Sequence, residues 1–392
     1  MTPISVKVPF VDLNWQHLPI QIEINRAISE VIQRGDFILG EALAQFEASF
    51  ARACGVSYGV GVASGTDAIA LGLQACGIGA GDEVLIPANT FIATVIGAIQ
   101  AGATPVLVDC EQNTALIDLE AAAKAITPKT KAIVPVHLYG QMVAPQKLLD
   151  FAAIYKLLIF EDAAQAHLAR RDGYFAGSVG LAAGFSFYPS KNLGAFGSGG
   201  IVVTNDETVA RRVRSLRNYG ATHKYFHTER GTNSRLDTLQ AAILNIKLPY
   251  LSGWNLERNQ AAYHYDRYLQ SLELQDTLPI ENRSGTGHVY HLYVIQLSKL
   301  LANKREKIQQ QLAERGIQTS IHYPIPCHLQ PGYRYLGYQK GDFPRAEKLS
   351  QQILSLPMYP GITKEQIEWV SQQLSLVAAN LTVACSDTLT SE

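Results

Sequence analysis

Leu157-Leu-Ile-Phe-Glu-Asp-Ala-Ala-Gln-Ala-His167 opens as an apolar, strand-like run and ends on a carboxylate, Asp162. Further along, Ser186-Phe-Tyr-Pro-Ser-Lys-Asn-Leu-Gly194 follows a second strand-like run and contains Lys191. Taken alone, a lysine is more often a surface charge, and an aspartate after a strand is more often a turn residue or a helix cap. An aspartate at one strand end and a lysine at the next is a more specific combination.

This pair is typical of a site for pyridoxal phosphate. The lysine amine holds the aldehyde of that cofactor as a Schiff base, and the aspartate keeps the pyridine nitrogen protonated. A protonated pyridine ring accepts electrons, so a neighbouring C–H bond can lose its proton. Lys191 and Asp162 are therefore the predicted catalytic residues, and the predicted chemistry is that of amino groups.

Short apolar runs alternate with helical patterns around these two residues. Strands are predicted at 83–87, 104–109, 131–137, 157–161, 183–187 and 200–204, and helices at 90–101, 118–126 and 145–156. This alternation predicts an α/β fold with a mainly parallel mixed sheet covered by helices. We assign residues 1–250 to a cofactor-binding large domain.

The chain changes character after residue 206. Helices are predicted at 206–218 and 235–254, a boundary near 249–253, strands at 288–295 and 318–322, and a helix at 303–315 capped by Asn303 and stopped by Gly316. These elements predict a smaller C-terminal α+β domain at 251–378. The polar end of the chain, 379–392, is predicted to be a disordered tail.

Composition narrows the class of protein. The 392 residues are 47% hydrophobic and 17% charged, with a formal net charge of −1. This balance gives no reason to expect a nucleic acid or an anionic membrane as a partner. The five cysteines are an odd number without Cys-x-x-Cys spacing, and neither a signal peptide nor a spanning segment is apparent. A cytoplasmic location is predicted.

Other segments could complete a cofactor site. Ala63-Ser-Gly-Thr-Asp67 precedes a helical run, and such a turn presents backbone N–H groups to a phosphate through Gly65 and Thr66. Ser186 could add a phosphate donor, Phe91 could cover one face of the pyridine ring, and Gln165 could reach its hydroxyl. The ordinary alternatives are a helix cap for the turn at Gly65 and Thr66, a core phenylalanine at 91, a core serine at 186 and a surface glutamine at 165.

Two loops have features of ligand sites of another kind. The run Gly194-Ala-Phe-Gly-Ser-Gly-Gly200 continues into a strand and not a helix, so we interpret it as tight turns beside the lysine and not as a nucleotide loop. His322, Cys327 and His328 share a proline-rich loop, but no second group of ligands at metal spacing accompanies them. No metal site is predicted.

In these segments the chain resembles the sugar aminotransferases of the DegT/DnrJ/EryC1/StrS family, which have the aspartate aminotransferase fold (fold type I). The resemblance covers about residues 9–375. It is carried in order by Pro9-Phe-Val-Asp-Leu13, Gly35-Asp-Phe-Ile-Leu-Gly40, Ser64-Gly-Thr-Asp67, Pro87-Ala-Asn-Thr-Phe-Ile-Ala-Thr94, Val136-His-Leu-Tyr-Gly-Gln141, Glu161-Asp-Ala-Ala-Gln-Ala-His167, the segment from Ser186 to Gly194, Asn233-Ser-Arg-Leu-Asp237, His322-Tyr-Pro-Ile-Pro326 and Leu356-Pro-Met-Tyr359.

The resemblance implies the same roles for Lys191, Asp162, Gln165, Gly65, Thr66, Ser186 and Phe91. It also implies that Asn233 reaches the cofactor phosphate of a neighbouring subunit, hence a homodimer with shared active sites. It places Tyr188, Lys224, His322 and Tyr323 where similar enzymes contact a nucleotide-sugar. Two departures lie near the site: Ala166-His-Leu-Ala169 and Ser198 replace the family's usual residues.

The activity implied by the resemblance is transfer of an amino group from glutamate to C3 of a dTDP-3-keto-6-deoxyhexose, with the cofactor cycling through pyridoxamine phosphate. Amination at C4, a UDP-linked sugar, or a non-sugar enzyme of the same family are the alternatives. A regulatory protein that has lost catalysis is disfavoured because Lys191 and Asp162 are both present. A dehydratase is disfavoured because related dehydratases replace the lysine with histidine.

Overall fold

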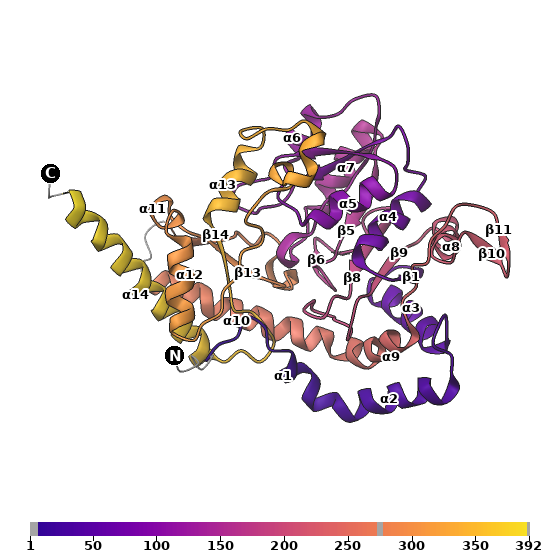
Figure 1. Ribbon diagram of the computed structural model, residues 1–392, viewed down its shortest axis with the longest axis horizontal. Coiled ribbons are helices and arrows are strands. Elements are labelled where there is room, and N and C mark those ends of the chain that lie inside the picture. The colour runs from indigo at the N-terminus through magenta and orange to yellow at the C-terminus, as the bar shows by residue number, and fades with distance from the viewer. Residues whose placement is uncertain (1–6, 273–276, 390–392) are drawn as a thin grey trace.

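The structure is a computed structural model that describes residues 7–272 and 277–389 of the chain. A large sheet with its helices occupies most of it, and a smaller group of C-terminal elements lies beside that sheet (Figure 1). Among these residues, none of the helices has the length and apolar character needed to span a bilayer.

The central sheet has seven strands in the order β1-β9-β8-β5-β4-β2-β3. All of them run parallel except β9, which pairs antiparallel with both of its neighbours. The mainly parallel mixed sheet predicted from the sequence is therefore confirmed. The strands are β1 (Tyr58–Val62), β2 (Glu83–Pro87), β3 (Thr104–Val108), β4 (Thr130–Ile133), β5 (Leu158–Asp162), β8 (Ala182–Ser186) and β9 (Gly200–Thr204).

Burial on both faces explains the apolar character of these strands, since helices pack against the sheet. Helix α4 (Gly65–Ala75) packs on β8, β9 and β5 and against the next helix, α5 (Ile92–Gln100). It approaches the sheet closely at Gly72, where a Cβ atom would lie 2.3 Å from the Phe160 ring. The start of α4 is fixed by Ser64, whose Oγ accepts the Asp67 N–H at 3.1 Å.

Further helices complete the layers around this sheet. Helix α3 packs on β1, and both α2 and α3 pack on α9. Strands β10 and β11 form a hairpin that projects from the body at one end of the long axis (Figure 1). The elements are α1 (Leu13–His17), α2 (Gln21–Arg34), α3 (Glu41–Ala53), α6 (Leu119–Lys124), α7 (Pro145–Tyr155), α8 (Glu207–Leu216), α9 (Thr238–Lys247), β6 (Arg170–Arg171), β7 (Tyr174–Phe175), β10 (Ala221–His223) and β11 (Phe226–His227).

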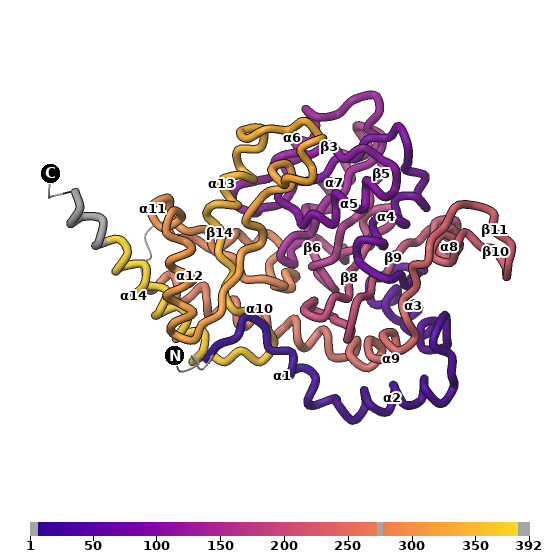
Figure 2. Tube along the Cα trace, viewed as in Figure 1, coloured from indigo at the N-terminus to yellow at the C-terminus, as the bar shows by residue number. Residues whose placement is uncertain are grey.

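The C-terminal elements form a second apolar core around a three-stranded antiparallel sheet, β12-β13-β14. The N-terminal segment runs beside these C-terminal elements (Figure 2). It joins their core, because Val8 is buried in it and forms a bridge with Ile317. The elements are α10 (Leu251–Ser271), α11 (Lys299–Ala302), α12 (Arg305–Glu314), α13 (Pro344–Gln352), α14 (Lys364–Leu389), β12 (Leu278–Pro279), β13 (Tyr293–Gln296) and β14 (Ile353–Leu356).

Several predicted elements of this C-terminal part differ from the structure. The predicted strand at 288–295 is reduced to β13, because Tyr290 has a φ of 39° and interrupts an extended backbone. The predicted strand at 318–322 is only a bridge between Ser320 and Ser355. Asn303 ends α11 and is not the cap of α12, which begins after Lys304.

The chain is also helical where a domain boundary and a tail were predicted. A short 3₁₀ turn at Leu248–Tyr250 links α9 directly to α10, so residues 249–253 are not an extended linker. Helix α14 continues to Leu389 and buries Leu381, so it occupies most of the predicted tail at 379–392. The last three residues of that tail lie outside the described residues.

Candidate active site

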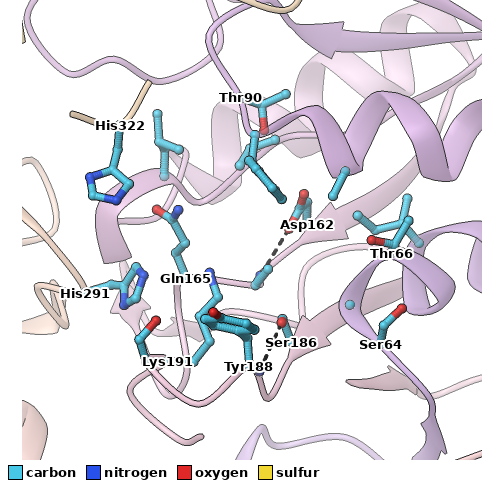
Figure 3. A pocket seen from close by; sticks show the side chains of 18 of the residues that line it. Ser64, Thr66, Thr90, Asp162, Gln165, Ser186, Tyr188, Lys191, His291 and His322 are labelled. Carbon is cyan, nitrogen blue, oxygen red and sulfur yellow. Dashed lines mark hydrogen bonds between the residues drawn. The ribbon is translucent and has the colours of Figure 1, made fainter. Parts of the chain in front are cut away.

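A cavity of about 320 Å³ lies at the carboxyl ends of the parallel strands, the usual position of ligand sites in open α/β sheets. In Figure 3, His291, His322 and Gln165 lie on one side of the cavity and Ser64 and Thr66 on the other. The lining residues are Ser64, Gly65, Thr66, Ile69, Thr90, Phe91, Ala93, Val136, Leu138, Asp162, Ala164, Gln165, Ser186, Tyr188, Ser190, Lys191, Ser198, Gly199, His291, His322 and Tyr323.

Lys191 and Asp162 both line this cavity. Asp162 is the last residue of β5, and Lys191 follows the neighbouring strand β8. Burial lowers the pKa of Lys191 to about 8, and the negative charge of Asp162 acts in the opposite direction. A lysine with this pKa supplies a substantial fraction of neutral amine near neutral pH, as a nucleophile and general base requires.

The Asp162 carboxyl is held by two donors. Its Oδ1 accepts the Ala164 N–H at 3.1 Å, and its Oδ2 accepts the Thr94 hydroxyl at 2.7 Å. Burial raises the pKa of Asp162, while these two hydrogen bonds and the positive charge of Lys191 lower it. A cationic ring nitrogen at this carboxylate would compensate further for the burial.

Gln165 is oriented by bonds to both ends of its amide. Its Oε1 accepts the Tyr139 N–H at 2.7 Å, and its Nε2 donates to the Tyr323 hydroxyl at 3.0 Å. The second N–H of the amide is free to meet a ring hydroxyl of a ligand. The half-exposed Phe91 ring lies 5.2 Å from the Tyr323 ring, so the two aromatic groups form one wall of the cavity.

The opposite end of the cavity suits a phosphate. The first N–H groups of α4, those of Gly65 and Thr66, have no acceptor within the helix and lie at the positive end of its dipole. The backbone of Gly65 lies so close to Ser186 that an added Cβ would be 2.6 Å from the Ser186 Cβ. The close approach brings the hydroxyl of Ser186 to the helix N-terminus.

This geometry predicts the effect of Gly65→Ala. The methyl group would push Ser186 away from the helix end, so we expect cofactor affinity to fall roughly tenfold, or about 1.4 kcal/mol. The measurement is the dissociation constant of pyridoxal phosphate, by titration of the apoenzyme. Gly253→Ala is the matched control, because a Cβ there meets nothing within 4 Å. Equal affinities of the two variants would contradict the phosphate position.

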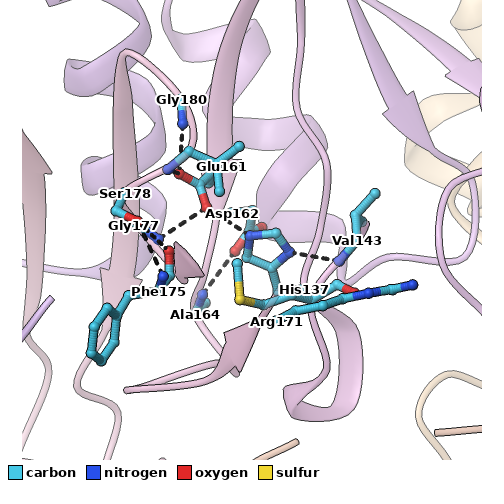
Figure 4. A network of polar contacts seen from close by, with 12 residues as sticks. His137, Val143, Glu161, Asp162, Ala164, Arg171, Phe175, Gly177, Ser178 and Gly180 are labelled. Atoms are coloured by element: carbon cyan, nitrogen blue, oxygen red, sulfur yellow. Dashed lines mark hydrogen bonds and ion pairs between the residues drawn. The ribbon is translucent and has the colours of Figure 1, made fainter. Parts of the chain in front are cut away.

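A second polar network fixes the backbone next to Asp162 (Figure 4). The buried Glu161 carboxylate accepts the N–H groups of Gly177, Val179 and Gly180 at 2.8–2.9 Å. It also lies 2.8 Å from Nε2 of His137. Because His137 Nδ1 accepts a backbone N–H at 3.2 Å, its Nε2 carries the proton and donates. Side chains alternate along a strand, so this network anchors β5 from the face opposite Asp162.

The structure brings most of the predicted site residues together. Ten of the twelve line the cavity: Gly65, Thr66, Phe91, Asp162, Gln165, Ser186, Tyr188, Lys191, His322 and Tyr323. The other two lie elsewhere in the same chain. Asn233 is exposed and forms a bridge with Asn218, and Lys224 lies between the strands of the β10–β11 hairpin.

Arg217 and Arg235, which could bind a carboxylate, make other contacts in this structure. Arg217 pairs with Glu47 and donates to the carbonyl of Gly61, and Arg235 donates to Asn218 at 2.7 Å. Neither is among the residues that line the cavity.

Sequence reasoning missed Thr94 and His291. Thr94 ends a family motif and was available as a signal, whereas nothing in the sequence near His291 relates it to Lys191.

The residues present fit pyridoxal phosphate. A buried carboxylate, a lysine with a lowered pKa and a helix N-terminus with free N–H groups match the ring nitrogen, the aldehyde and the phosphate of that cofactor. The fold and this site define the class: a pyridoxal phosphate-dependent enzyme with the aspartate aminotransferase fold.

Comparison with known sequences identifies the family. The chain belongs to the DegT/DnrJ/EryC1/StrS aminotransferase family, whose sequence model matches residues 19–375. This confirms the resemblance seen in its motifs.

Individual relatives match over nearly their full length. The chain is 43% identical to dTDP-3-amino-3,4,6-trideoxy-alpha-D-glucose transaminase of Streptomyces venezuelae, covering 92% of this chain and 93% of the relative. It is also 43% identical to UDP-N-acetyl-3-dehydro-alpha-D-glucosamine 3-aminotransferase of Acidithiobacillus ferrooxidans, covering 93% and 96%. The crystal structure of S. venezuelae DesV with a ketimine intermediate superposes with a TM-score of 0.91 at 42% identity, covering 95% of this chain and 99% of DesV.

Proposed function

We propose that this protein is a pyridoxal phosphate-dependent aminotransferase that moves an amino group from glutamate to C3 of a dTDP-3-keto-6-deoxyhexose. The observation that carries the proposal is the meeting of Lys191 and Asp162 in one cavity at the carboxyl ends of the sheet strands. The choice of sugar is supported by the 43% identity to a dTDP-3-amino-sugar transaminase.

Each side chain then has a definite task. Bound pyridoxal phosphate supplies an electron sink beside the carbon that carries the amino group. Lys191 would take the proton of the donor α-carbon on Nζ and deliver it to C4′ of the cofactor, and would carry a proton in the opposite direction in the second half-reaction, as general base and acid. Asp162 keeps a positive charge on the ring nitrogen. Gln165 and Phe91 fix the plane of the ring, and Gly65, Thr66 and Ser186 hold the phosphate.

Two further residues act from a second copy of the chain in this proposal. Asn233 contacts the phosphate in the partner subunit's site, and Lys224 contacts the substrate pyrophosphate. The β10–β11 hairpin that carries Lys224 stands away from the body, and its Tyr225 is 84% exposed, as expected of an arm that reaches a neighbour (Figure 1). The exposed Phe37 and Ile38 offer apolar surface for the same homodimer.

In this proposal Tyr188, His322 and Tyr323 contact the nucleotide-sugar. His322 and Tyr323 lie on the side of the cavity away from the phosphate, whereas Tyr188 lies next to Ser186 (Figure 3). The cofactor-binding unit is residues 1–250, and residues 251–378 form the smaller domain that closes this side. The second apolar core around β12–β14 supports such a division.

A UDP-linked acceptor is the second candidate. It is favoured by the equal 43% identity to a UDP-N-acetyl sugar 3-aminotransferase. The two candidates share the attacked carbon and differ in the nucleotide, so they are separated by substrate and not by mechanism.

The visible spectrum of the purified enzyme tests both half-reactions. Glutamate should remove the yellow band of the bound cofactor, and a dTDP-3-keto-6-deoxyhexose should restore it. Restoration only by a UDP-linked 3-keto sugar would favour the second candidate. A band that glutamate does not change would contradict glutamate as the donor, and a protein that forms no band with added cofactor would contradict the site itself.

A further inference from the structure

His291 lines the same cavity as Lys191, although it comes from the C-terminal part of the chain and the sequence does not relate the two residues. Figure 3 shows its ring on the same side of the cavity as Gln165 and His322. The side chain is 8% exposed. The residues that contact its ring from behind the cavity wall determine its protonation state.

The first contact is with Asn192, the residue after Lys191. The Oδ1 of Asn192 lies 3.1 Å from Nδ1 of His291. The Nδ2 of the same amide lies 2.9 Å from both the Val289 carbonyl and Oδ1 of Asn255. A carbonyl accepts only, so the nitrogen of Asn192 must face Val289, and its oxygen must face His291.

Asn255 confirms this orientation independently. Its Nδ2 donates to the carbonyl of His167 at 2.9 Å, which leaves its Oδ1 to accept from Asn192. Both amides are thus oriented by backbone carbonyls. Because Oδ1 of Asn192 can only accept, Nδ1 of His291 must carry a proton.

The second nitrogen of His291 is then an acceptor. Burial lowers the pKa of His291 well below its usual range, and the positive charges of Lys191 and Arg258 add to this effect. A neutral ring with its proton on Nδ1 presents an unprotonated Nε2. Nδ1 is turned towards Asn192, so the lone pair of Nε2 is available at the cavity wall.

Lys191 is the strongest donor that this lone pair can meet. It is the one lysine or arginine among the residues that line the cavity. A charged donor forms a hydrogen bond about twice as strong as a neutral donor. The groups that face His291 from the surrounding elements are Lys191, Arg258, His322 and His167. His167 is buried and His322 is half-buried, and desolvation lowers the pKa of both.

We propose that His291 is a positioning residue for Lys191: its Nε2 accepts a hydrogen bond from the lysine ammonium when that lysine is not joined to the cofactor. The acceptor stabilises and orients the protonated amine between the two proton transfers. The Asn192–Asn255 amide pair sets the tautomer that makes this possible. The inference rests on the proposed aminotransferase function and adds a residue to it.

A matched pair of variants isolates the acceptor. His291→Gln keeps a polar group near the position of Nε2, and His291→Met has a similar length and volume without it. The rate at which the apoenzyme captures pyridoxal phosphate should rise with pH to a midpoint set by the pKa of Lys191, near 8 in the wild type. We expect a midpoint about one pH unit lower in the Met variant and little changed in the Gln variant, because a bond to the charged form is lost only in the former.

A second measurement is made on the wild type, and the variants serve only to assign its signal. Nitrogen chemical shifts of ¹⁵N-histidine-labelled wild-type apoenzyme should show one buried histidine with Nδ1 protonated and Nε2 bare, lost in both His291 variants. An Nε2-protonated His291, or equal midpoints in the Gln and Met variants, would overturn the proposal. If the midpoints differ as expected but the wild type aminates no nucleotide-sugar, the proposed substrate fails and the role of His291 stands.

Discussion

Lys191→Ala is expected to reduce turnover by about 10⁴-fold or more, the range seen when a nucleophile or general base is removed from an enzyme. The variant loses the amine that joins the aldehyde and carries the proton. The phosphate and ring contacts at Gly65, Ser186 and Asp162 remain, so the cofactor should still bind without covalent attachment. The measurements are the amination rate, and the release of cofactor on gel filtration.

Two comparisons make this result specific to the site. Lys147→Ala removes an exposed lysine from α7 and should leave the rate unchanged. A small primary amine added to Lys191→Ala should restore part of the activity, because an external amine can occupy the space of the lost side chain and carry the proton. Full activity of Lys191→Ala without added amine would refute the assignment of the catalytic lysine.

The site residues that lie close in sequence to the end of a strand could be predicted. Asp162, Lys191 and Gly65 each follow an apolar run that becomes a sheet strand, and parallel strands bring such ends to one edge. Apolar runs also identified six of the seven strands of the main sheet, because both faces are covered and the runs are continuously apolar; β1 was not predicted.

Long-range contacts could not be predicted in the same way. His291 approaches Lys191 only because α10 holds the segment before β13: Arg258 donates to the Tyr290 carbonyl at 3.1 Å and Asn259 to the His288 carbonyl at 2.7 Å. The same tethering explains why the strand predicted at 288–295 begins only at Tyr293. The residues before it have the β-branched and aromatic composition of a strand, but the carbonyls of His288, Tyr290 and His291 accept hydrogen bonds from α10 side chains.

Asp162→Asn is expected to reduce turnover by about 10³-fold, equivalent to about 4 kcal/mol in activation free energy. The amide is nearly the same shape as the carboxyl. Its oxygen can still accept the Ala164 N–H, and the Thr94 hydroxyl can turn, so the fold should be retained. An amide cannot hold a positive charge on the pyridine nitrogen, and without that charge the ring is a weaker electron sink.

The size of this effect separates charge from hydrogen bonding at the same position. Thr94→Val removes the 2.7 Å bond to Oδ2 but leaves the carboxylate, so turnover should fall by about tenfold, in the range of one hydrogen bond to a charged group.

Asp162 also raises the pKa of Lys191, so Asp162→Asn should shift the pH midpoint of cofactor capture below the wild-type value near 8. The neutral amine then dominates at lower pH, and capture becomes faster at pH 7 while amination becomes slower. A faster capture together with a slower amination is expected only if the charge of Asp162 acts on both the ring and the lysine. Equal losses of turnover in Asp162→Asn and Thr94→Val would instead show that Asp162 acts only as a hydrogen-bonding group.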